Sequence, residues 1–288
     1  MRFSVALAMC DPDQYLPVAR AAAEAGWHAV AVPDSPFFPE QTSAAYHYSA
    51  DGGRYWNGDT PFLDPWVAIP AMAAITERLR FYTMVLKLPI RQPLLIAKTV
   101  ATAAVLSGDR VALGVGLSWM PEEFAWLAED FASRGPRTDE AVAIIRTVLA
   151  GGMVEHHGDH YDFDRLQMSP VPSAPVPIYI GGMTPPALRR AARIGDGWIS
   201  ANVTTDELAV SIEQLRAALA AQGRTTEGFE IKVVATDAFD LDGFRRLRDL
   251  GVTDAITQPW WFYGGDPNSL TTKVDAVRRF ADEIGSAL

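Results

Sequence analysis

The amino-acid sequence predicts one α/β domain over residues 1–288, a (β/α)8 TIM barrel with insertions after strand 2 and before strand 5. Short runs rich in Val, Ile and Phe alternate strictly with longer Ala-, Leu-, Arg- and Glu-rich stretches of helical periodicity. There are eight runs of each kind, which is the pattern of a parallel barrel. The 288 residues slightly exceed the length of about 250 that is typical of this fold. A doubly wound sheet is the alternative, but it usually stops at about five or six strands.

The predicted strands are short and rich in β-branched or aromatic residues, as are strands buried on both faces of a parallel sheet. In chain order they are Phe3–Met9, Ala29–Pro33, Leu79–Leu86, Val111–Leu117, Val176–Gly181, Gly197–Ala201, Glu230–Ala235 and Ala255–Gln258. The stretch after each strand places its apolar residues at helical spacing. The predicted helices are Asp13–Ala25, Pro65–Thr76, Pro93–Ser107, Arg137–Ala150, Pro185–Ile194, Asp206–Gln222, Leu241–Leu250 and Leu270–Ile284.

Two insertions interrupt this alternation. Phe37–Phe62 separates the second strand from its helix and is rich in aromatic residues. Loops of this length are usually functional, and in a barrel this one would stand over the catalytic mouth. The second insertion, Gly151–Pro177, contains a turn at Gly158 and a Pro-rich run, and we expect it to form a small hairpin.

Composition and charge exclude several classes of protein. The chain has 25 Lys and Arg against 35 Asp and Glu, a net charge of −10, so it repels phosphate backbones and we expect no nucleic-acid partner. The single cysteine, Cys10, excludes a disulfide framework and a cysteine-rich zinc module. The apolar start Met1–Cys10 is too short for a signal peptide, and no segment reaches the roughly 18 apolar residues that span a bilayer. We expect a cytoplasmic protein without a membrane partner.

In a barrel, catalytic residues follow the carboxyl ends of the strands. The side chains in such positions are Cys10, Asp34, Ser35, Lys87, Ser118, Trp119, Glu122, Gly181, Gly182, Thr184, Asn202, Trp260 and Trp261. This set is rich in aromatic residues and glycine and poor in acids and bases, which favours a pocket for a flat cofactor over a hydrolytic centre. The Gly-x-Ser-x-Gly elbow of serine hydrolases is missing from the sequence.

The paired glycines Gly181 and Gly182 follow a buried strand, where they would let the backbone approach a ligand closely. Thr184 at the N-cap and Pro185 then open a helix whose N-terminus could bind an anion. An ordinary tight turn with a capped helix explains the same residues, and both interpretations stay open at this point.

Three other motifs give weaker evidence of function. Gly114-Val115-Gly116 resembles the start of a dinucleotide fingerprint, but Trp119 stands where the third glycine should be. His156, His157 and His160 fall in the hairpin-like segment, away from the predicted mouth, so a solvated turn is favoured over a metal site, and no metal is expected. Cys10 has no basic neighbour in sequence to lower its pKa and is expected to be a plain buried side chain.

Several fragments, taken in order, resemble the luciferase-like monooxygenase family, in its branch that uses the deazaflavin coenzyme F420. The fragments are Val85–Pro93, Leu106–Val111, Leu113–Gly116, Trp119 with Glu123-Phe124, Pro177–Gly182 and Gly195–Trp198. Each is weak alone, whereas their order and spacing together are specific, and the resemblance covers nearly the whole chain.

The resemblance implies that the tricyclic ring of the cofactor lies in the barrel mouth. Asp34 matches the position near the polar edge of the ring, and the Met84–Val85 bond matches a non-proline cis peptide whose bulge supports the ring. Further cofactor-contact positions are matched by Lys87, Leu117, Ser118, Glu122, Gly181, Gly182, Thr184 and Pro185. The anion at the glycine pair would be the phosphate of the coenzyme. Glu122 should weaken the binding of a polyanionic cofactor unless it faces away or accepts a hydrogen bond.

Two residues depart from the sugar-phosphate dehydrogenases of this branch. Ser35 replaces a His that follows the aspartate, and Trp119 replaces a Glu after strand four. A substrate alcohol would therefore lack its general base, which disfavours sugar-phosphate oxidation. Reduction of an activated C=C or C=N bond, or oxygen insertion, stays open. No catalytic residue is assigned; Ser35, Trp119, Trp56 and Tyr55 are the pocket candidates.

We therefore expect an F420-dependent oxidoreductase that transfers a hydride between the deazaflavin and a small, flat or apolar organic substrate. The expected pocket walls are Tyr48, Tyr55, Trp56, Trp119, Trp260 and Trp261, whereas Trp27, Trp66 and Trp198 are expected in the core. Two alternatives stay open: an FMN-dependent monooxygenase that uses molecular oxygen, and a flavin- or deazaflavin-binding protein without turnover. Members of the family are commonly dimers, so a homodimer is expected.

Overall fold

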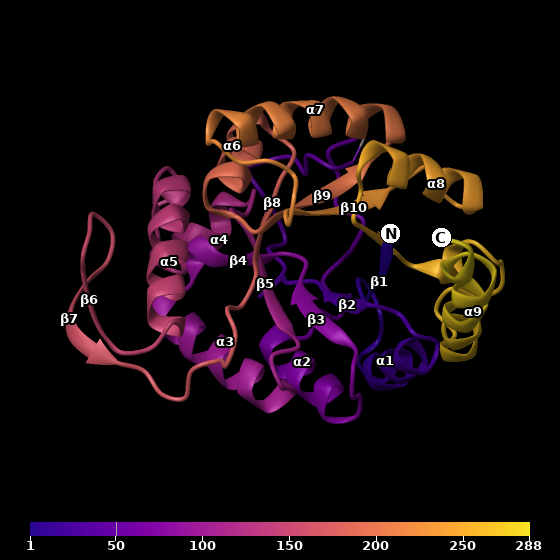
Figure 1. The fold of residues 1–288 in the computed structure, drawn as a ribbon, viewed down its shortest axis with the longest axis horizontal. Helices are drawn as coiled ribbons and strands as arrows, with labels where there is room; N and C mark the ends of the chain where they lie inside the picture. Colours follow the sequence, from indigo (N-terminus) through magenta and orange to yellow (C-terminus); the bar gives the residue numbers. More distant parts are fainter. Residues whose placement is uncertain (50) are drawn as a thin grey trace.

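Parallel strands form a closed barrel (Figure 1). The structure, a computed structural model, describes residues 1–49 and 51–288. The barrel strands are β1 (Arg2–Ala6), β2 (Ala29–Val32), β3 (Arg80–Thr83), β5 (Val111–Gly116), β8 (Ile178–Gly181), β9 (Gly197–Val203), β10 (Glu230–Ala235) and β11 (Asp254–Thr257). They pair in the order β3-β2-β1-β11-β10-β9-β8-β5, and a further pairing of β3 with β5 closes the barrel. The predicted TIM barrel is confirmed.

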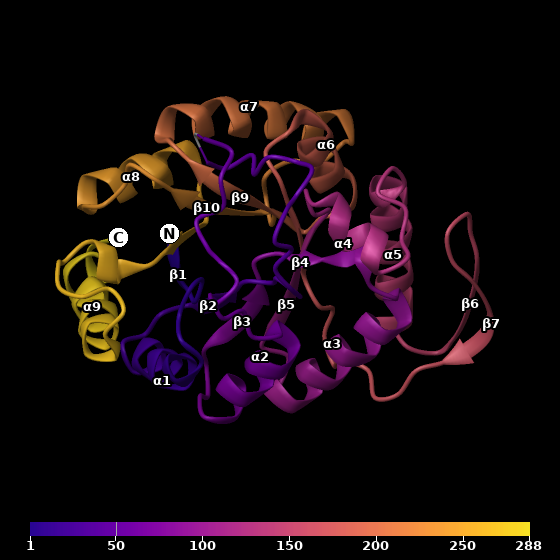
Figure 2. The same cartoon turned by 180° about the vertical axis from the view of Figure 1, so that it is seen from behind.

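Helices cover the outside of the barrel (Figures 1 and 2). They are α1 (Tyr15–Glu24), α2 (Pro65–Ala74), α3 (Pro93–Ser107), α4 (Pro121–Trp126), α5 (Arg134–Leu149), α6 (Pro185–Ile194), α7 (Thr205–Ala221), α8 (Leu241–Leu250) and α9 (Leu270–Glu283). Short 3-10 turns are η1 (Pro12–Gln14), η2 (Leu88–Ile90), η3 (Pro259–Trp261) and η4 (Gly285–Ala287). Helices α3, α6 and α8 have the predicted bounds.

Two predicted strands continue three residues beyond the end of the barrel strand in the structure. The strand predicted over Phe3–Met9 ends at Ala6, and the backbone then turns with Met9 at a φ of 59°. The strand predicted over Leu79–Leu86 is divided into β3 and β4 (Leu86–Lys87), which both pair with β5. The sequence pattern does not reveal this break between β3 and β4, because the residues on both sides of it are apolar.

Helix α4 was not predicted. It lies between β5 and α5, with Pro121 in its first turn followed by Glu122 and Glu123. A proline at the first helical position and acidic residues in the first turn are helix-start signals, so the sequence contained the information. The helix has only six residues, too few to show a periodic pattern.

The interior of the barrel is polar at the end where the strands begin. Lys232 of β10 is 1% exposed, and its ammonium lies 2.6 Å from Asp254 of β11 and 2.8 Å from Glu230. The rings of Tyr82 and Tyr179 pack on the same ammonium at 4.6 Å each. This cluster fills the barrel end that usually serves stability rather than catalysis.

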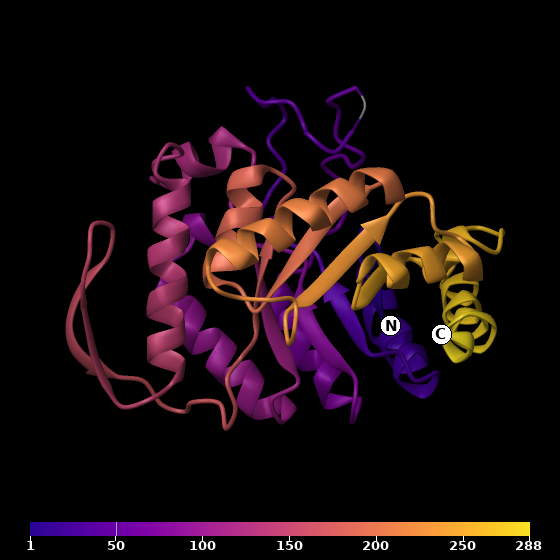
Figure 3. The same ribbon diagram turned by 45° about the horizontal axis from the view of Figure 1, so that its top comes forward.

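Two segments stand outside the barrel. The predicted hairpin is confirmed: β6 (Met153–His157) pairs antiparallel with β7 (Asp162–Gln167) and projects beside α5 (Figure 1). The segment between β2 and α2, which includes the predicted loop Phe37–Phe62, rises above the carboxyl ends of the strands (Figures 2 and 3). Among the described residues, no helix is long and apolar enough to cross a membrane.

Candidate active site

The peptide bond between Met84 and Val85 is cis, as the family resemblance implies. It separates β3 from β4 and places Val85 against two neighbouring strands. A Cβ on Gly116 of β5 would lie 2.5 Å from Val85 Cγ2, and a Cβ on Gly181 of β8 would lie 3.0 Å from Val85 Cγ1. The two glycines therefore leave the room that Val85 occupies. This assigns Gly116, the last residue of the Gly114-Val115-Gly116 run, to the packing of the barrel mouth.

Asp34 lies beside this break, directly after β2 and Pro33. Its carboxylate accepts a hydrogen bond of 2.8 Å from the backbone N–H of Lys87 and one of 2.7 Å from the guanidinium of Arg91. The Asp34 side chain is only 2% exposed. Because each carboxylate oxygen has more than one lone pair, the fixed carboxylate can still accept another donor.

The Lys87 side chain turns to a different carboxylate. Its ammonium pairs with Glu123 of α4, whose side chain is fully buried, and Ser118 donates its hydroxyl to the other Glu123 oxygen at 2.6 Å. Ser118 holds a left-handed backbone conformation with a φ of 62°. Glu123 therefore joins two of the predicted contact residues, Lys87 and Ser118, although it was not itself predicted as one. Its neighbour Glu122 was selected instead.

Glu122 faces the long loop rather than the barrel interior. It accepts a hydrogen bond of 2.7 Å from the backbone N–H of Ser43. Partial desolvation raises the pKa of the Glu122 carboxyl, but the hydrogen bonds from Ser43 outweigh it and the pKa is lowered. The expectation that Glu122 faces away or accepts a hydrogen bond agrees with this geometry, which fastens the loop to α4.

Aromatic side chains of the same loop gather around one tyrosine. The ring centroid of Tyr46 lies 5.0 Å from Trp56, 5.3 Å from Trp119, 5.4 Å from Tyr48 and 5.7 Å from Tyr55. Burial raises the pKa of the Tyr46 phenol to about 12, so it stays protonated at neutral pH. Trp119 comes from the end of β5, so this aromatic cluster joins the loop to the mouth.

The glycine pair at the end of β8 forms a tight turn. Gly182 has a φ of 118°, and a Cβ there would lie 2.9 Å from Ala187 Cβ. The turn itself therefore requires glycine, and a Gly182→Val variant would strain the fold instead of leaving it intact. Thr184 is the N-cap of α6, as predicted, but its hydroxyl makes no capping bond. Pro185 and Pro186 have no N–H, so fewer backbone donors face an anion here than at an ordinary helix start.

The comparison with known sequences identifies the family. A family model described as luciferase-like monooxygenase matches residues 6–239. The chain belongs to the luciferase-like monooxygenase family. An uncharacterized protein of Mycobacterium tuberculosis is 42% identical over 286 residues, 99% of each chain. The F420-dependent glucose-6-phosphate dehydrogenase of Nakamurella multipartita is 31% identical over 243 residues, which cover 80% of this chain and 68% of that one.

The fold of this luciferase-like protein is shared with solved structures. The coenzyme F420-dependent tetrahydromethanopterin reductase of Methanopyrus kandleri superposes with a TM-score of 0.78 over 99% of both chains, at 15% sequence identity. At that identity the likeness concerns the barrel alone. Family membership and the sequence relatives, rather than this likeness, support an oxidoreductase.

The remaining predicted site residues differ in how far they are buried. Ser35 donates its hydroxyl to Phe37 O at 3.4 Å, and Leu117 is half-buried after β5. Trp261 is exposed, whereas Trp260 is 2% exposed and belongs to the hydrophobic core, so its assignment to the pocket wall was wrong. It packs on the buried ammonium of Lys273. Trp27, Trp66 and Trp198 are buried, as predicted.

Cys10 and the histidines take no part in this site. Burial raises the pKa of the Cys10 thiol to about 11, although Lys273, distant in sequence, lies close enough to lower it. His156 pairs with Glu140 at 2.9 Å and His157 with Asp162 at 2.5 Å, both on the hairpin side. Within residues 1–49 and 51–288, no group of three or more His, Cys, Asp or Glu side chains is arranged to bind a metal ion.

Proposed function

We propose that this protein is an F420-dependent oxidoreductase that transfers a hydride between the deazaflavin and a small, flat or apolar organic substrate. The observation that carries the proposal is the Asp34 carboxylate, held by Lys87 and Arg91 beside the Val85 bulge. Family membership and the F420-dependent relatives support the same conclusion.

The residues of the mouth fit such a cofactor. Val85, seated on Gly116 and Gly181, offers an apolar support for a flat ring, and Asp34 offers an acceptor for a ring N–H. The unused hydroxyl of Thr184 and the N-terminus of α6 offer donors for a phosphate. The remaining contact positions are Met84, Lys87, Leu117, Ser118, Gly182 and Pro185, while Glu122 would act through the loop.

When bound, a deazaflavin supplies a hydride carried on a ring carbon. The chain contributes positioning, which is most effective when the reacting atoms are held about 3–3.5 Å apart. Tyr46, Tyr55, Trp56 and Trp119 would exclude water and stack on a flat substrate. Ser35 and Trp119 provide no general base for an alcohol, so reduction of an activated C=C or C=N bond, or oxygen insertion, is favoured over sugar-phosphate oxidation.

Binding to the purified protein distinguishes the cofactors. We expect tight binding of F420 in a fluorescence titration; tight FMN binding without F420 binding would favour the flavin monooxygenase. Turnover of a panel of enones, imines and quinones with reduced F420 then tests catalysis. Its failure across the panel would favour a binding protein without turnover.

The variant Asp34→Ala tests whether the Asp34 carboxylate binds the cofactor ring. Loss of a hydrogen bond from a ring N–H to a charged acceptor should weaken F420 binding by about 1–3 kcal/mol. Circular dichroism and thermal unfolding control for folding, because Asp34 also binds Arg91. Unchanged F420 affinity in a folded variant would contradict the assignment of Asp34 to the ring.

We also propose the homodimer. Val67 of α2 and Leu95 and Leu106 of α3 are 73%, 68% and 71% exposed and lie on adjacent helices, where a second copy of the chain would cover them. Sedimentation velocity at micromolar concentration tests this, and a monomer would refute it.

A further inference from the structure

A cavity of about 750 Å³ lies at the end of the barrel where the strands begin, opposite the mouth. The starts of β1, β2 and β3 line it together with the ends of α1 and α9, close to both labelled ends of the chain (Figures 1 and 3). We call it the basal cavity. Small-molecule sites have volumes of about 300–1,000 Å³, so it is large enough to hold a ligand. The buried cluster around Lys232 lies between it and the mouth, which makes it a separate site.

The basal cavity is lined by more positive than negative side chains. Arg2, Arg78 and Arg80 contribute guanidinium groups, whereas Asp282 contributes the one carboxylate among the described lining residues. His28 is neutral, because burial lowers its pKa to about 4, and it adds a hydrogen-bonding group without a charge. This lining is unexpected in a chain with a net charge of −10.

The charge of Arg2 is already compensated. Its guanidinium lies 2.7 Å from Glu230, which also binds Lys232 at 2.8 Å, and Lys232 binds Asp254 at 2.6 Å. Two cations and two carboxylates thus form a neutral network in the barrel interior. This network leaves no carboxylate for the other two guanidinium groups of the cavity.

Arg78 and Arg80 have no ion-pair partner among the residues that the structure describes. Arg78 is exposed, and Arg80 is half-buried and donates a long hydrogen bond of 3.4 Å to Asp109 O. Burial lowers the pKa of the neighbouring Arg110, and the positive charge of Arg80 lowers it further, so Arg80 lies beside a like charge. With Asp282 alone to offset two guanidinium groups, the cavity retains about one positive charge.

One wall of the basal cavity is aromatic. Trp27 stacks on Phe280 with the ring centroids 5.0 Å apart, and Phe3 packs edge-on against both rings. The indole N–H of Trp27 already binds Val277 O at 3.0 Å, so the ring offers the cavity an apolar surface. A molecule in the cavity would therefore contact both guanidinium groups and an apolar wall.

We propose that the basal cavity binds a small organic carboxylate with an apolar body. Arg78 and Arg80 are two residues apart and line the same cavity, so they can share one carboxylate through paired N–H donors. The apolar body would rest on Trp27 and Phe3. An inorganic anion would use the charges alone, and a neutral ring the wall alone. This inference goes beyond the proposed function and does not depend on it.

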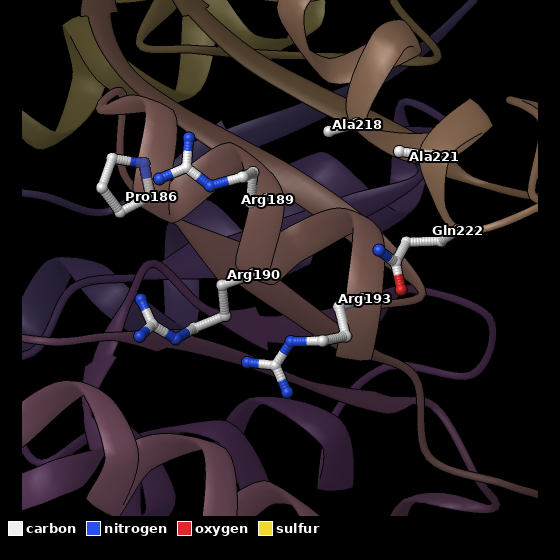
Figure 4. A pocket seen from close by; sticks show the side chains of 7 residues that line it. All are labelled: Pro186, Arg189, Arg190, Arg193, Ala218, Ala221 and Gln222. Atoms are coloured by element: carbon white, nitrogen blue, oxygen red, sulfur yellow. The ribbon is translucent and has the colours of Figure 1, made fainter.

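Isothermal titration calorimetry with naphthoate as the probe tests the proposal. The neutral isostere naphthamide controls for the ring, and inorganic phosphate controls for the charge. The cavity variants are Arg78→Gln and Arg80→Gln. Arg189→Gln is the matched control, because Arg189 is also exposed and without an ion pair in the described part of the chain. It lies on α6 in a different arginine-lined groove of about 310 Å³ (Figure 4).

We expect the wild-type protein to bind naphthoate roughly tenfold more tightly than naphthamide, and roughly tenfold more tightly than phosphate. Each cavity variant should lose most of the preference for naphthoate and bind naphthamide as the wild-type protein does, while Arg189→Gln should retain the preference. The presence of F420 should leave naphthoate binding unchanged.

Three results would refute the basal cavity as the site: equal binding of naphthoate and naphthamide, full naphthoate affinity in both cavity variants, or displacement of naphthoate by F420. Phosphate binding as tight as that of naphthoate would show that the aromatic wall takes no part, and would refute the organic carboxylate as the ligand. The proposed function stands in each case, because these variants leave the mouth unaltered.

Discussion

Gly116→Ala tests the packing that forms the floor of the mouth. The new Cβ would lie 2.5 Å from Val85 Cγ2, against about 3.5–4.0 Å for a normal carbon contact. Val85 cannot swing aside easily, because it is β-branched and its other methyl faces Gly181. Overpacking of this kind lowers the free energy of unfolding by about 1–3 kcal/mol. The replacement of glycine by alanine raises it by about 0.4–1 kcal/mol, because alanine reduces the conformational entropy of the unfolded chain.

We therefore expect Gly116→Ala to lower the free energy of unfolding by about 1–2 kcal/mol. With an unfolding entropy of about 2.1 cal/mol/K per residue, 288 residues give a fall in Tm of about 2–3 °C. Differential scanning calorimetry and urea unfolding measure both quantities. Gly285→Ala is the matched control, because its Cβ would meet only Phe280 O at 3.8 Å.

A second substitution makes the test specific. Val85→Ala removes both methyl groups, so in the Gly116→Ala background it should restore stability beyond the sum of the single changes by about 1 kcal/mol or more. If the two changes simply add, or if Gly116→Ala is as stable as the wild-type protein, Val85 does not occupy the space over Gly116.

Three further predictions concern stability and reactivity. Glu123→Leu leaves the Lys87 ammonium without its carboxylate and should reduce the free energy of unfolding in urea by about 3 kcal/mol; a loss below about 1 kcal/mol would show that Lys87 reaches solvent instead. Burial lowers the pKa of His28 from 6.5 to about 4, so His28 is neutral in the folded protein and its contribution to stability is present above pH 6.5 and lost as the pH falls toward 4. After screening at this partly exposed site, the contribution is about 1–2 kcal/mol, and His28→Gln should flatten the stability profile by that amount between these pH values. Burial also raises the pKa of Cys10 from 9.0 to about 11, so at pH 8 the thiolate is about a hundredfold scarcer and iodoacetamide should label the protein only in urea; rapid labelling of the native protein would contradict this.

The sequence predicted the barrel because periodicity is a local signal. Alternating strand and helix patterns, the hairpin around Gly158 and the start of α6 at Thr184 and Pro185 each depend on residues close in the chain. The bounds of β10 and α6 were correct for this reason.

The contacts of the site were harder to predict from the sequence, because they join residues that meet only in the folded barrel. Glu122 and Glu123 are adjacent, and a rotation of about 100° per residue sends one to the loop and the other to Lys87. Nothing in the local sequence says which one faces the barrel. Cys10 similarly gains Lys273 as a neighbour only after folding.

The cluster around Lys232 has a consequence for access to the barrel interior. Lys232, Asp254, Tyr82 and Tyr179 fill the cross-section of the barrel where the strands begin and are nearly inaccessible to solvent. A molecule seated among the strand ends would therefore not leave through this cluster, and would pass the loop that Glu122 fastens to α4. Residence time would then be governed by how often that fastening opens, so Ser43 would influence release rates without touching the occupant.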